Sequence, residues 1–143
     1  MGVVRDPVND QLLRLSYKDP KNIKNFLRNW GGLESLSRKG DAVATCILVD
    51  LKVVTGIDLE KFDRRNRKPF NLCYLDGKLS YYQYMSIAYT LVLGYSQQDI
   101  AFVMGVDQSV VSKNINSGIK RIQRELKAYL EVEESEFDKM WIR

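Results

Sequence analysis

Between residues 79 and 115 the chain alternates residues that begin helices with glycines that end them. Ser80 and Ser96 can each accept a hydrogen bond from a backbone amide of the turn that follows, and Asp107 can do the same. Gly94 and Gly105 can adopt the positive φ at which a helix stops. Apolar residues between these positions recur at helical spacing. The pattern predicts helices over 81–93, over 97–104 and from 108 onward.

The last two of these helices have the spacing of a helix-turn-helix. Ala101 is small enough for a close helix crossing, and Gly105 follows four residues later, where the turn is needed. Val106, Val111 and Ile115 would seal the second helix against the first. An ordinary helical pair in a bundle is the alternative. DNA binding is favoured because the opposite face offers small polar groups, amides and one cation to a major groove: Gln108, Ser109, Ser112, Lys113 and Asn116.

Residues 79–126 resemble region 4 of sigma-70-type factors and related response-regulator DNA-binding domains. The matching positions are Leu79, Gly94, Ser96, Ile100, Ala101, Gly105, Val106 and Val111, followed by the basic residues Lys120, Arg121, Arg124 and Lys127. The chain has no counterpart of the sigma region that melts promoter DNA, and no receiver domain. In length and layout it is similar to small phage and prophage regulators, such as late-gene activators of the ArpU type. The resemblance implies an all-α protein, with an N-terminal helical part before a C-terminal DNA-binding helix-turn-helix (78–130).

This interpretation predicts which side chains meet DNA. The polar face of the helix from Gln108 would enter the major groove, where amides can pair with adenine and lysine with guanine. The start of the preceding helix would hold a phosphate through its free amides, around Ser96, Gln97 and Gln98. Cations further along would follow the DNA backbone, namely Lys120, Arg121 and Arg124. Gly118 would mark either a bend or a close helix contact.

The first 69 residues predict a helical region. A weakly amphipathic stretch over 8–17 precedes Asp19-Pro20, which should open a helix that Gly31-Gly32 ends, with a further turn or two over 33–37. Asp41 and Gly56 should bound a helix over 42–55. This helix is apolar almost all round, so it lies either in the core or in an oligomer interface. Asp76-Gly77 indicates a plain turn or a small hairpin.

Two segments have unusual charge. Residues 61–68 form either a basic arm on the DNA backbone or a solvated linker, and their cations are Lys61, Arg64, Arg65, Arg67 and Lys68. The tail over 131–143 combines five acids with Phe137, Met140, Trp141 and Ile142. The apolar residues of the tail can pack on the core or dock on a partner. Its acids can repel DNA or meet a basic surface such as that of RNA polymerase.

Composition argues against an enzyme or a metalloprotein. The chain has no histidine and two cysteines, Cys46 and Cys73, which fit no zinc-ligand spacing. It has no phosphate loop, nucleophile elbow or paired carboxylates. We therefore expect no catalysis, no metal and no cofactor.

The distribution of charge favours a polyanionic partner. The chain has net charge +4, and removal of the tail, which is net −3, leaves +7 on residues 1–130. No apolar run is long enough to span a bilayer, and Asp6 and Asp10 interrupt any signal peptide. We expect a cytoplasmic protein of a bacterial host cell that binds double-stranded DNA as a homodimer or higher oligomer. The alternatives are a small terminase-like packaging protein and a polymerase-docking protein that does not read DNA.

Overall fold

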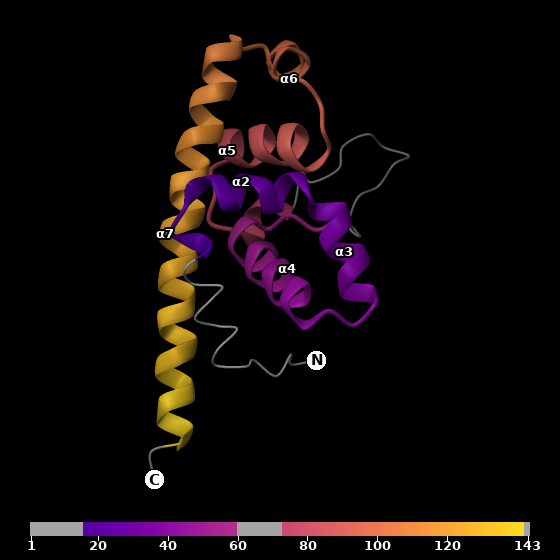
Figure 1. The fold of residues 1–143 in the computed structure, drawn as a ribbon. Helices are drawn as coiled ribbons and strands as arrows, with labels where there is room; N and C mark the ends of the chain where they lie inside the picture. The colour runs from indigo at the N-terminus through magenta and orange to yellow at the C-terminus, as the bar shows by residue number, and fades with distance from the viewer. Residues whose placement is uncertain (1–15, 60–72, 142–143) are drawn as a thin grey trace.

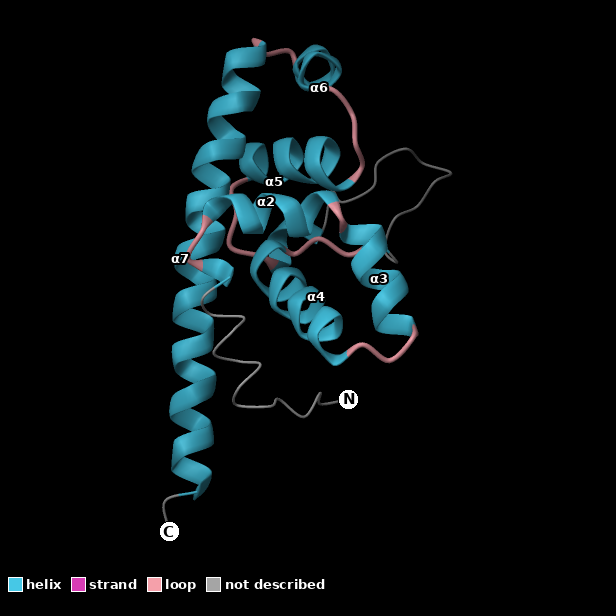
Figure 2. Ribbon diagram, viewed as in Figure 1, coloured by secondary structure: helices cyan, strands magenta, loops and turns pink. Residues whose placement is uncertain are grey.

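The structure, a computed structural model, describes residues 16–59 and 73–141. Every regular element in these two ranges is helical, which confirms the predicted all-α class (Figure 2). The predicted basic segment with Arg64, Arg65, Arg67 and Lys68 lies outside the described residues, as does most of the stretch over 8–17. The elements are α2 (Pro20–Arg28), α3 (Trp30–Arg38), α4 (Ala42–Thr55), η2 (Cys73–Asp76), α5 (Tyr81–Ile87), η3 (Ala88–Val92, a π-helical turn), α6 (Gln97–Met104) and α7 (Gln108–Trp141).

Helix α2 begins at the predicted residue, but it does not end at the predicted glycines. The Asp19 side chain caps α2 by accepting from the amide of Lys21 at 2.9 Å, and Pro20 occupies the first turn. However, α2 ends at Arg28, and Gly31-Gly32 lie inside the first turn of α3. A side chain at position 32 would collide with the side chain of Asn29, so glycine leaves room for that asparagine at the junction of the two helices.

Helix α4 is a core helix. The Asp41 carboxylate accepts from the amide of Ala44 at 3.0 Å, and Gly56 ends the helix at φ 74°, as predicted. Most of the helix surface is buried against α3, α7 and η2. Val43 and Val49, which the sequence pattern assigned to the apolar stripe, are each 39% exposed. The helix therefore belongs to the core of the chain, and its use as an oligomer interface stays a prediction.

The segment around Asp76-Gly77 is a turn and not a hairpin. Residues Cys73–Asp76 form a short 3-10 helix, and the amide of Lys78 donates to the carbonyl of Val54 at 2.8 Å. A Cβ at position 77 would collide with the backbone of Thr55. Glycine is thus needed where this turn passes the end of α4.

Helix α7 joins both predicted regions of the chain. Its 34 residues make it roughly 50 Å long, and it runs along one side of the other helices with its C-terminal part extending past them (Figure 1). It packs against α2, α4, α5 and α6. Ile119, Ile122 and Leu126 are almost fully buried in this contact. One continuous core therefore includes side chains from α2 through α7.

Candidate nucleic-acid interface

Helix α5 and the π-helical turn η3 support the segment that was predicted to bind DNA. Ser80 and Gln83 form a reciprocal capping box at the start of α5. Tyr84 and Ile87 are fully buried against the rest of the core. Gly94, at φ 81°, then turns the chain toward α6.

Helix α6 and the start of α7 pack against each other. The Ser96 hydroxyl caps α6 by accepting from the amide of Asp99 at 3.1 Å. Gly105 ends the helix at φ 69°, and the amide of Val106 donates to the carbonyl of Ala101 at 3.0 Å. Ala101 and Val111 are 5% and 0% exposed, so the inner faces of the two helices are closely packed.

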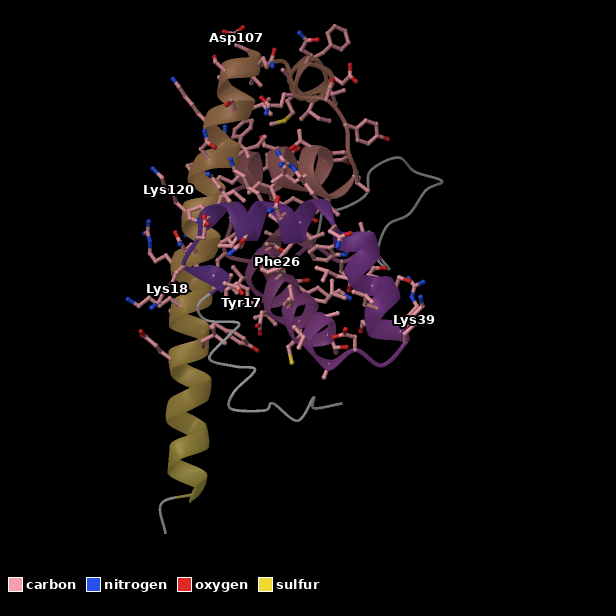
Figure 3. The ribbon with its side chains drawn as sticks, in the orientation of Figure 1. Tyr17, Lys18, Phe26, Lys39, Asp107 and Lys120 are labelled. Atoms are coloured by element: carbon pink, nitrogen blue, oxygen red, sulfur yellow. The ribbon has the colours of Figure 1, made fainter. Side chains whose placement is uncertain are left out.

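The predicted polar residues on the first three turns of α7 point away from this contact. Of these, Ser112 is half-buried and the rest are exposed. Asp107, the residue just before α7, lies at one end of the molecule, away from most of the core (Figure 3). We call the set the outer face of α7: Gln108, Ser109, Ser112, Lys113 and Asn116.

The cations that follow on α7 divide between two sides of the helix. Lys120 follows Lys113 by seven residues and Arg124 follows Lys120 by four, so the three lie on one strip. Arg121 instead follows Ser117 by four residues, and Ser117 accepts a hydrogen bond from the Gln83 side chain of α5 at 3.2 Å. All of these cations are exposed. The strip with Lys113 therefore continues the outer face, whereas Arg121 lies on the flank nearer α5.

A contribution of α2 to this surface was not predicted from the sequence. The Lys24 ammonium donates to the side-chain oxygen of Asn116 at 3.3 Å, across 92 residues of sequence. Arg28, one helical turn further, is also exposed. A basic stripe follows one side of α2, beside its buried residues, and this spacing was visible in the sequence: Lys21, Lys24 and Arg28.

The segment just before α2 is held on α7 by a second polar contact. The Gln123 amide donates to the backbone carbonyls of Tyr17 and Lys18 at 3.0 and 2.6 Å. Figure 3 shows the Lys18 and Lys120 side chains extending from the same side of the molecule. A cation from the segment before α2 and one from α7 thus lie on the same side of the molecule.

The described residues include no cluster of three or more potential metal ligands. No helix among them is long and apolar enough to cross a membrane. No protein-family model, curated protein or solved structure matches the chain.

Proposed function

We propose that the protein binds duplex DNA sequence-specifically through a sigma-region-4-like helix-turn-helix formed by α6 and α7. The observation that supports this most is that the start of α7 has one buried apolar face and one exposed polar face. Val111 and Ile115 are buried against the core, whereas the outer face presents amides, hydroxyls and Lys113 to solvent at one end of the molecule. A helix presented in this way can enter a major groove.

In this proposal the outer face of α7 contacts base edges and its surroundings contact phosphates. Gln108 and Asn116 carry amides that can pair with adenine, and Lys113 can pair with guanine. The capped start of α6, at Ser96 and Gln97, offers backbone amides to a phosphate. Lys120 and Arg124 continue along the DNA backbone, with Arg121 on the flank.

We further propose that the biological role is transcriptional control in a phage or prophage, of the late-gene activator type. One outer face reads few base pairs, so a homodimer on two half-sites is the expected form. Light scattering with and without DNA tests this: a dimer supports transcriptional control, whereas a ring of eight or more subunits would favour DNA packaging. Contact with RNA polymerase is part of the same proposal, and run-off transcription from a bound promoter tests it.

The DNA-binding proposal is tested with the double variant Lys113→Ala, Asn116→Ala. A preferred duplex is first selected from random sequences with the wild-type chain, and affinities for this duplex and a scrambled one are then compared. Each lost base contact is worth about 1–3 kcal/mol of discrimination, so the preference should fall roughly tenfold or more. A control variant, Arg38→Ala with Lys39→Ala, removes two exposed cations at the C-terminal end of α3, and its preference should match that of the wild type.

Two results would contradict the proposal. If the Lys113→Ala, Asn116→Ala variant keeps the wild-type preference, α7 is not the recognition helix. If the wild-type chain binds no duplex even at low salt, the protein does not act on DNA, and a polymerase-docking role is favoured instead.

A further inference from the structure

A pocket of ≈ 350 Å³ lies between α2, the end of α5–η3 and the α6–α7 pair. It joins parts of the chain that no local sequence pattern connects. The side chains of α2 that line it are Lys24 and Arg28, and the start of α6 contributes Ser96 and Gln97. Ser112 and Asn116 of the outer face of α7 form another part of the wall. The pocket is therefore continuous with the surface proposed to face DNA.

The lining of the pocket suits an anion. Two of its side chains are cations, most of the others are polar, and none of the described lining residues is acidic. Arg28 presents a planar fork of donors that matches a phosphate, and Lys24 adds a compact positive charge. The amides at the start of α6 and the positive end of its helix dipole add to the same field. The cations of α2 and the backbone amides at the start of α6 thus line the same pocket.

Lys24 contacts Asn116 on the outer face of α7, and this contact can be exchanged for one with a phosphate. The Lys24 ammonium donates to the Asn116 side-chain oxygen at 3.3 Å. A phosphate in the pocket is a stronger partner for Lys24 than this neutral amide, because it adds the attraction between opposite charges to the hydrogen bond. Lys24 can therefore leave the Asn116 side chain and bind a phosphate in the pocket.

We propose that Lys24, Arg28 and the start of α6 form a binding site for one phosphate of the DNA backbone, beside the groove that α7 enters. This inference rests on the proposed function and extends it, because it makes α2 part of the DNA-binding surface. It predicts that the site strengthens binding to all duplexes equally, since the phosphate is common to every sequence.

The experiment uses the full chain and the double variant Lys24→Ala, Arg28→Ala, with Arg38→Ala, Lys39→Ala as the control of equal charge. Affinity for the preferred and the scrambled duplex is measured over a series of salt concentrations. The pocket variant should lose roughly tenfold in affinity for both duplexes. Its plot of log affinity against log salt should be less steep by about one unit, the contribution of one phosphate contact. The control should show neither change, and equal thermal unfolding midpoints should confirm that all chains are folded.

A second arm separates DNA phosphate from a free phosphate. The unfolding midpoint is measured in inorganic phosphate and in chloride at equal ionic strength, for the wild type and the pocket variant. If the wild type binds DNA and the pocket variant matches it in affinity and salt slope, the phosphate site is wrong and the DNA-binding proposal stands. A loss confined to the preferred duplex would also overturn the site, because it would indicate base recognition. If the wild type binds no duplex but inorganic phosphate stabilises it through Lys24 and Arg28, DNA as the source is overturned along with the proposed function.

Discussion

Gly118 lies where α7 crosses α5, and replacing it with alanine tests how closely the two helices pack. A Cβ at this position would lie closer to the Cδ1 atom of Ile87 than non-bonded atoms can approach. Its distances to the Cβ of Gln83 and the Cγ1 of Ile87, 3.4 and 3.5 Å, are ordinary contacts. The sequence predicted either a bend or a close helix contact at Gly118. The structure has the close contact, and helix α7 is continuous at this residue.

The expected stability change is the sum of two opposed effects. Alanine in the middle of a helix is favoured over glycine by about 1 kcal/mol. Overpacking a well-filled core typically costs about 1–3 kcal/mol, and Ile87 is fully buried. We expect Gly118→Ala to lower the free energy of unfolding by about 0–2 kcal/mol.

The variant Ile87→Val isolates the collision, because it removes the Cδ1 atom and little else. By itself it should cost about 1 kcal/mol. In that background Gly118→Ala should stabilise the protein by about 1 kcal/mol, so the two changes should be coupled by about 1–3 kcal/mol. Gly31→Ala on α3, where an added Cβ has no neighbour within 4 Å, serves as the control and should not destabilise.

Urea unfolding of the wild type, both single variants and the double variant measures the coupling. Effects that add to within about 0.5 kcal/mol would refute the inferred crossing. Stabilisation by Gly118→Ala alone, equal to that by Gly31→Ala, would refute it as well.

Two further predictions concern the buried Tyr17 and the half-buried Tyr89, with Tyr82→Phe on an exposed residue as the common control. The Tyr17 hydroxyl donates to the fully buried carboxyl of Asp50 at 2.8 Å, so Tyr17→Phe should lower the free energy of unfolding by about 1–3 kcal/mol in urea titrations; no loss would contradict this contact. Burial, with smaller effects of nearby tyrosines, raises the pKa of Tyr89 above its ordinary value of about 10. The unfolded chain therefore releases this proton first, and the stability from Tyr89 is complete below about pH 10 and decreases as pH rises through the folded-state pKa. Tyr89→Phe should reduce the alkaline loss of unfolding free energy, and a pH dependence equal to that of the wild type would contradict this.

Helix starts and stops were predictable because they depend on neighbouring residues. Ser80, Asp41 and Ser96 each accept from an amide three residues later, and Gly56 and Gly105 have positive φ at the ends of helices. Such interactions are local, so the order of the residues is enough to indicate them. The same holds for the polar outer face of α7, whose spacing follows from the helix repeat.

The boundary between α2 and α3 could not be predicted in this way. Paired glycines usually indicate the end of a helix, yet here they lie within the first turn of α3. Trp30, fully buried, begins that helix and donates from its indole nitrogen to the Glu34 side chain at 2.7 Å. Burial of this large side chain and the space needed by Asn29 decide the position, and both depend on the packed structure.

Part of the candidate site could likewise be predicted from local sequence, and part of it depends on the packed structure. The sequence by itself determined the capped pair α6–α7 and the polar residues of its outer face, because these depend on contacts three or four residues apart. Only the tertiary structure decided that Lys24 lies against Asn116, that Arg28 joins it in one pocket, and that the flank of α7 with Arg121 is the one nearer α5. These relations depend on how α2 and α5 pack around α7, and packing across 92 residues of chain has no local pattern that could indicate it.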